Sequence, residues 1–131
     1  MSREEGRFAS EWVRRREERR RRLQALAAEA RADLAAIIEV LTRQYGVRRV
    51  ILFGSLRKGR FVEESDIDLA VEGLRRADFY EALGAVNRLS RWWVDLKPLE
   101  DLEPFFRERV LREGEQLFPR GEDTDAVDGN R

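Results

Sequence analysis

The sequence predicts a small mixed α/β domain, in which helices pack on a sheet of short strands. Its 131 residues suit one domain with a modest core. The hydrophobic pattern changes along the chain in the order helix, strand, strand, helix, strand, helix, which is typical of α/β and α+β domains. Hydrophobic residues make up 42% of the chain and charged residues 40%, so the core should lie beneath a strongly ionised surface.

The first element is a long helix predicted over residues 8–45, where no Gly or Pro interrupts the chain. Gly46 is well placed to end it. Apolar residues in its second part recur every three or four positions and form one stripe: Leu23, Leu26, Ala30, Leu34, Ile37, Ile38 and Leu41. Residues 1–22 are rich in Arg and lack such a stripe, so we assign them to a separate helical extension.

The remaining elements are shorter and follow one another closely. In chain order they are a buried strand over 50–53, a polar connection over 55–64, a strand over 66–71, an amphipathic helix over 77–91, a strand over 92–96 that Pro98 ends, and a helix from about Asp101 to Gly114. We expect the helices to pack on one side of the sheet. The main domain is assigned to residues 23–118, and the tail 119–131 is predicted to be disordered because it lacks periodicity.

Several kinds of site are excluded by composition. The chain has no His and no Cys, which excludes Ser-His-Asp and Cys-His catalysis, thiolate zinc, iron–sulfur clusters and disulfides. A bound metal must therefore use carboxylates, which favour Mg²⁺, Mn²⁺ or Ca²⁺. The 26 basic and 26 acidic residues balance, so net charge does not favour nucleic acid or membrane. No apolar run is long enough to span a bilayer and no signal peptide is evident, so we expect a cytoplasmic protein.

Two surface features suggest contacts with other molecules. The Arg-rich run over 14–22 is interrupted by Glu17 and Glu18 and has few aromatic residues, so direct binding of nucleic acid is not favoured over a solvated face or a contact with an acidic partner. Trp92 and Trp93 are adjacent, and on a strand they must face opposite ways. We expect one in the core and the other exposed to a partner. Homo- or hetero-oligomers both remain open.

Three aspartates form the candidate catalytic and metal site. On a strand Asp66 and Asp68 emerge on the same face, about 7 Å apart at the backbone. Two like charges held this close repel each other unless a cation neutralises them, and a pair of divalent ions would fit such a site for phosphoryl transfer. Asp95 lies in another strand between two apolar neighbours, and it is the candidate for a third carboxylate.

Gly54 and Ser55 stand at the end of the first predicted strand, where the chain enters a turn. A glycine allows the backbone to approach a phosphate closely, and amides of the next helical turn with the Ser55 hydroxyl would donate to phosphate oxygens. Lys58, with Arg57 or Arg60, supplies positive charge for a triphosphate. Ser65 is assigned to nucleotide binding as well. A Gly-Ser pair alone is more often only a turn, and its position ten residues before Asp-x-Asp gives it weight.

The stretch GSLRKGRFVEESDIDLAVEG resembles the signature of the DNA polymerase beta-like nucleotidyltransferase superfamily, and the small size resembles its minimal nucleotidyltransferase branch. The similarity covers roughly residues 47–118. It implies the nucleotidyltransferase fold, ATP as substrate and Mg²⁺ or Mn²⁺ as cofactor. It also implies that Gly54 and Ser55 hold phosphates, that Asp66 and Asp68 bind metal, and that Asp95 completes the site and activates the acceptor hydroxyl.

The same resemblance implies a partner, because these proteins are often encoded beside a HEPN-domain toxin. Some members transfer AMP from ATP to a tyrosine of that toxin and so neutralise it. One departure is that Leu56 stands where related sequences commonly have Arg. The prediction is therefore a protein-adenylylating antitoxin. Two alternatives are an antitoxin that acts by occlusion without catalysis, and a small-molecule nucleotidyltransferase whose pocket is completed by a partner or a second copy.

Overall fold

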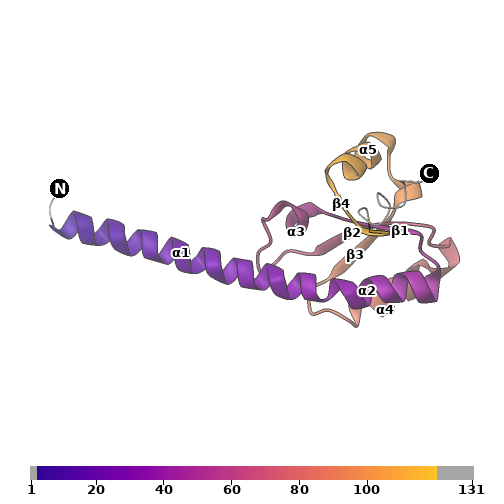
Figure 1. The fold of residues 1–131 in the computed structure, drawn as a ribbon, viewed down its shortest axis with the longest axis horizontal. Coiled ribbons are helices and arrows are strands. Elements are labelled where there is room, and N and C mark those ends of the chain that lie inside the picture. Colours follow the sequence, from indigo (N-terminus) through magenta and orange to yellow (C-terminus); the bar gives the residue numbers. More distant parts are fainter. Residues whose placement is uncertain (1–2, 121–131) are drawn as a thin grey trace.

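The computed structural model describes residues 3–120, and it confirms a mixed α/β domain built on one four-stranded sheet (Figure 1). The strands are β1 (Arg49–Phe53), β2 (Ile67–Glu72), β3 (Val94–Pro98) and β4 (Glu115–Phe118). They lie in the order β3-β2-β1-β4, with β2 and β3 parallel and the other two pairs antiparallel. Most of the tail predicted to be disordered, 121–131, lies outside the described residues.

The helices are interrupted more often than the sequence predicts. They are α1 (Arg3–Ala32), α2 (Leu34–Glu39), a π-helical turn (Val40–Gln44), α3 (Gly54–Lys58), α4 (Phe79–Asn87) after a 3₁₀ turn (Arg76–Asp78), a second 3₁₀ turn (Leu99–Asp101), and α5 (Pro104–Glu113). The single helix predicted over 8–45 is thus wrong in detail. It begins earlier and breaks at Asp33, whose amide donates to the Ala30 carbonyl at 3.1 Å and tightens that turn.

Two further differences occur near the C-terminal end. The last helix begins at Pro104 and not near Asp101, because the Glu103 side chain caps it by accepting the Phe106 amide at 3.1 Å and Pro104 suits the first helical position. The sequence does not predict β4, since four residues are too few to show a clear alternation. β4 pairs with β1 and forms one edge of the sheet.

The sheet is covered on both faces, which corrects the expectation that helices pack on one side. The main core lies on one face, between the sheet and the helices α1, α2 and α4, and the largest of its fully buried residues are Ile37, Leu41, Val50, Leu52, Ile67, Leu69, Val71, Val86 and Val94. The opposite face carries α5 (Figure 1). A smaller cluster lies there, in which Val110 of α5 packs with Ile51, Ala70 and Leu99. α5 is the only helix in this cluster among the described residues.

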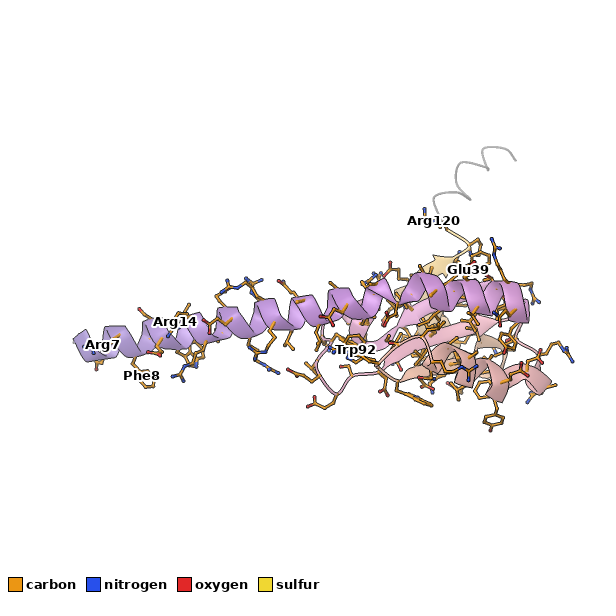
Figure 2. The ribbon with its side chains drawn as sticks, turned by 90° about the horizontal axis from the view of Figure 1, so that it is seen from below. Arg7, Phe8, Arg14, Glu39, Trp92 and Arg120 are labelled. Carbon is orange, nitrogen blue, oxygen red and sulfur yellow. The ribbon has the colours of Figure 1, made fainter. Side chains whose placement is uncertain are left out.

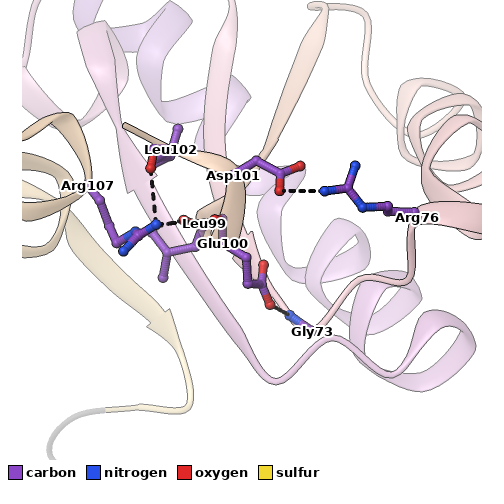
Figure 3. A network of polar contacts seen from close by, with 7 residues as sticks. All are labelled: Gly73, Arg76, Leu99, Glu100, Asp101, Leu102 and Arg107. Carbon is purple, nitrogen blue, oxygen red and sulfur yellow. Dashed lines mark hydrogen bonds and ion pairs between the residues drawn. The ribbon is translucent and has the colours of Figure 1, made fainter. Parts of the chain in front are cut away.

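A network of polar contacts fixes the segment that follows β3 (Figure 3). The Arg107 guanidinium donates to the carbonyls of Leu99, Glu100 and Leu102 at 3.0–3.1 Å. The Glu100 carboxylate accepts the Gly73 amide at 2.8 Å, which ties this segment to the end of β2. The end of β3 is therefore held by both α5 and β2.

α1 extends well beyond the sheet (Figure 1). It has 30 residues, a length of about 45 Å, but its packing against the main core begins at Leu26. Phe8, Trp12 and Val13 are exposed on the extending part, which Figure 2 shows carrying Arg7 and Arg14 as well. The boundary assigned at residue 22 falls inside this continuous helix. None of the helices in residues 3–120 combines the length and apolarity that crossing a membrane requires.

Candidate active site

The candidate site begins with strand β2, whose side chains alternate between the two faces of the sheet. Ile67, Leu69 and Val71 are fully buried in the main core. Asp68 therefore points to the opposite face, the one that α5 covers only in part. Asp66 directly precedes the strand and is exposed. The apolar half of β2 thus anchors the strand while its other half presents a carboxylate.

Strand β3 places a second carboxylate beside the first. Asp95 and Asp68 are register partners in the parallel pair, so their side chains emerge on the same face from strands about 4.8 Å apart. Val94 and Leu96, on either side of Asp95, are buried in the main core. The Lys97 ammonium lies on the Asp95 side of the strand, with Nζ 3.1 Å from Asp95 Oδ2.

Burial and the proximity of three aspartates, only one of which forms an ion pair within the described chain, set the electrostatics of this face. Burial, followed by the charges of Asp95 and Asp66, raises the pKa of Asp68 from 3.8 to about 6, and Lys97 lowers it in part. Asp68 and Asp66 take part in no ion pair within the described chain. A carboxylate pair of this kind has the hard oxygen donors that suit Mg²⁺ or Mn²⁺. Across residues 3–120, however, no three acidic side chains lie close enough together to form a ready ligand group, so the three-aspartate metal site stays a prediction.

Gly54 lies directly against the Asp68 carboxylate. It follows β1, whose last residue, Phe53, is the register partner of Asp68, and its φ is 78°. A Cβ at position 54 would overlap Asp68 Oδ2 and lie only 3.0 Å from Asp68 Cγ. Glycine is required here both for the left-handed backbone and for the space. Gly54 and Asp68, which belong to the same sequence motif, are therefore in direct contact in the folded chain.

Helix α3 begins at Gly54 and carries the residues predicted to bind phosphate. The Ser55 hydroxyl makes no hydrogen bond to the described part of the chain, and Lys58 is exposed and forms no ion pair there. Leu56 is buried in the main core, so the residue that departs from the family pattern points away from the site and fixes α3 to the sheet. The free amides of the first helical turn begin beside Asp68.

A small pocket of about 230 Å³ opens beside α3, between it and α5. Its lining includes Gly54, the aromatic residues Phe53 and Phe106, the acidic Glu113 and three cationic residues. Of these cations, Arg57 pairs with Glu115 and Arg109 with Glu113, whereas Lys58 forms no ion pair within the described chain. Pockets that enclose a whole small molecule are usually larger, at about 300–1,000 Å³. The volume suits part of a nucleotide, and the cations suit phosphate oxygens.

Ser65 lies in the turn before β2, where its hydroxyl accepts the Val62 amide at 2.9 Å and its own amide donates to the Val62 carbonyl at 3.0 Å. Its observed contacts order the turn that presents Asp66.

Lys97 and Arg109 lie near the site but are not predicted by any of the sequence patterns above. The sequence could have indicated Lys97, because it lies two positions after Asp95 and residues two apart on a strand share a face. Arg109 carries no such signal, because only the packing of α5 brings it near Gly54.

Comparison with known proteins places this geometry among nucleotidyltransferases. A family model described as polymerase beta, nucleotidyltransferase matches residues 35–123. A solved structure of a minimal nucleotidyltransferase is 33% identical, with a TM-score of 0.60, and the match covers 67% of this chain and 92% of that one. No curated protein matches the chain significantly. The extending part of α1 lies outside the region that the family model matches.

Solved toxin–antitoxin structures are similar as well. One, determined with AMP-PNP, is 26% identical with a TM-score of 0.57, covering 70% of this chain and 77% of that one. Another contains a tri-AMPylated HEPN toxin of Shewanella oneidensis in complex with its MNT antitoxin. It is 24% identical with a TM-score of 0.56, and the match covers 75% of this chain and 81% of that one. At this identity the second likeness shows a shared fold.

Proposed function

Because the chain belongs to the polymerase beta nucleotidyltransferase family, we propose that it is a Mg²⁺- or Mn²⁺-dependent enzyme that transfers AMP from ATP to a hydroxyl group of a partner protein. One observation carries the proposal. Asp68 and Asp95 are in register on a partly open face of the sheet, and Gly54 at the start of α3 touches Asp68. Carboxylates for a metal and amides for phosphates are therefore side by side.

The reaction joins the acceptor oxygen to the α-phosphorus of ATP. The bond from that phosphorus to the bridging oxygen of the β-phosphate breaks, and pyrophosphate leaves. A bound divalent cation supplies charge neutralisation for the phosphates. Asp66, Asp68 and Asp95 are the residues that would hold it, and Asp95 would accept the hydroxyl proton. Burial, together with the charges of Asp95 and Asp66, raises the pKa of Asp68, so a cation bound beside it would favour the ionised carboxylate.

The phosphate groups would lie along α3. Ser55 has a free hydroxyl, and Lys58 has a free ammonium that faces the pocket shared with α5. The pocket is too small for a whole nucleotide, so part of ATP would extend over the open face. Positioning and charge stabilisation would supply most of the rate, because no covalent intermediate with the protein is needed.

A HEPN-type toxin is the acceptor we propose. The structure determined with AMP-PNP is of a toxin–antitoxin, and at 26% identity it supports a similar setting for this chain. Trp93 supports a protein acceptor, because it is 52% exposed two positions before Asp95, where an incoming partner would pass. An adenylylating antitoxin would neutralise the toxin by modifying a tyrosine hydroxyl.

The test is a labelling reaction with the protein product of the adjacent gene, which this proposal predicts to be a HEPN-domain toxin. Parallel reactions with ATP labelled at the α- or the γ-phosphate, each with Mg²⁺, should label the partner from the α-position alone. Asp68→Asn and Asp95→Asn should lose the label while still co-purifying with the partner. Arg43→Met, which removes an exposed charge far from the site, is the matched control and should label normally.

Two outcomes would contradict the proposal. Label from the γ-phosphate would indicate phosphorylation. A stable complex with no label from either position would favour an antitoxin that acts by occlusion.

A further inference from the structure

Strand β3 carries a positive charge inside the acidic site. Lys97 lies two positions after Asp95, so both side chains stand on the same face of the sheet. The Lys97 Nζ is 3.1 Å from Asp95 Oδ2, and the two side chains are 41% and 35% exposed. This is the only ion pair that any of the three aspartates forms within residues 3–120. Asp95 therefore already has a cationic partner where a divalent cation is expected.

The backbone of Lys97 is held in place by its surroundings. Its register partner on β2 is Ala70, a fully buried small residue, so no large side chain stands beside it on that strand. Pro98 follows it, and the polar network around Arg107 holds the next turn (Figure 3). The backbone of Lys97 is thus rigid while its long side chain keeps rotational freedom. The ammonium is able to leave Asp95 without any change in the sheet.

We propose that Lys97 is a built-in counter-cation of the carboxylate site, which competes with a divalent cation for Asp95. In the metal-free protein it reduces the repulsion among the aspartates. Entry of the metal requires the ammonium to leave Asp95, and the charge that remains nearby weakens metal binding. This inference rests on the metal site of the proposed function, but it concerns affinity for the cation and not transfer of AMP.

A purely structural ion pair would behave differently. Removal of one partner from an exposed structural pair changes stability only slightly and leaves the affinity for metal unchanged. Removal of a competing cation increases the affinity for metal, because Asp95 loses its bound competitor and the other carboxylates lose a nearby positive charge. Metal affinity in the absence of nucleotide therefore separates the two roles.

The experiment is a titration of the nucleotide-free, full-length protein with Mn²⁺, followed by the electron paramagnetic resonance signal of free Mn²⁺. Lys97→Met should bind Mn²⁺ more tightly than the wild type, on the order of tenfold. Lys97→Arg keeps the charge and should bind nearly as the wild type does. Arg43→Met, which removes one positive charge from a distant helix, should also leave the affinity unchanged.

A second measurement checks that the variant is folded. With a chelator present, Lys97→Met should melt at a lower temperature than the wild type, since the aspartates lose their counter-charge. Saturating Mn²⁺ should raise its melting temperature more than it raises that of the wild type.

Equal or weaker Mn²⁺ affinity of Lys97→Met would overturn the role of Lys97, whether or not AMP transfer occurs. If neither protein binds Mn²⁺ and Asp68→Asn is indistinguishable from both, the metal site of the proposed function fails, and this inference fails with it. AMP transfer that is absent despite tighter Mn²⁺ binding by Lys97→Met would overturn the acceptor or the chemistry but support the counter-cation.

Discussion

The two faces of strand β2 serve opposite purposes. On one face, Ile67, Leu69 and Val71 are completely buried and join the sheet to the main core. On the other, Asp68 sits beside Asp95 in an arrangement that disfavours its own charge. The comparison teaches that one strand can hold an unfavourable carboxylate pair because its alternate residues stabilise it. Stability and chemistry are separated by the two-residue period of the strand, so each should respond to its own substitutions.

The largest effect is expected on the buried face. Leu69→Ala removes a fully buried side chain and leaves a cavity, so the free energy of unfolding should fall by about 2–5 kcal/mol. Urea denaturation measures it. The matched control is Asp68→Asn on the neighbouring position of the same strand, which should not destabilise the fold at neutral pH. If both substitutions destabilise to a similar degree, the two faces do not have separate roles.

A smaller loss of stability is expected from substitution of Gly54, which follows β1 and contacts Asp68 of β2. Gly54→Ala places a Cβ against the Asp68 carboxylate and forces a positive φ on alanine, at a cost of about 1–3 kcal/mol. AMP transfer should fall more steeply than stability, because the carboxylate must move aside. Gly59→Ala is the control, since its φ is 74° but nothing lies within 4 Å of its Cβ.

Comparison of the two glycine variants separates backbone strain from the contact with Asp68. Both should lose stability through φ, but only Gly54→Ala should lose most of the transfer. Equal loss of transfer in the two variants would indicate that the contact between Gly54 and Asp68 has no part in the reaction.

On the open face, Asp68 should make the free energy of unfolding depend on pH. The pKa of Asp68 is about 6 in the folded protein against an ordinary value of 3.8, so the folded state binds its proton more tightly than the unfolded chain does. Its contribution to stability is therefore fully present below about pH 4, is lost as the pH rises through 6, and stays absent above that. Asp68→Asn should remove this dependence.

Urea midpoints between pH 4.5 and 7.5 for the wild type and Asp68→Asn provide the measurement. The difference between the two proteins cancels the pH dependence that they share and isolates Asp68. We expect Asp68→Asn to be the more stable protein at pH 7.5 by about 1 kcal/mol, a value that allows for solvent screening of a partly exposed group. Parallel curves for the two proteins would show that Asp68 is not perturbed.

The sequence predicts the strand faces well and the long-range packing poorly. Alternation places Asp68 opposite Leu69 without any knowledge of the fold, and the flanking apolar residues do the same for Asp95. The pairing of Asp68 with Asp95 requires the register between β2 and β3, which no local pattern specifies. The covering of the second face by α5 is also non-local. Leu56 shows this limit of sequence-based prediction. It departs from the family motif in the sequence, but in the folded chain its side chain is buried in the main core.

The smallest effect on stability is expected at Trp93. Its neighbour Trp92 is buried and meets Phe61 edge-to-face, with ring centroids 5.6 Å apart, whereas Trp93 is 52% exposed. Trp93→Ala should therefore change the free energy of unfolding by no more than about 0.5 kcal/mol. Exposed tryptophans at interfaces often contribute strongly to binding. Trp93→Ala should accordingly weaken the complex with the proposed HEPN-domain partner, measured by isothermal titration calorimetry. An unchanged affinity would mean that the partner approaches the carboxylates from another side, past α5 and the cationic pocket.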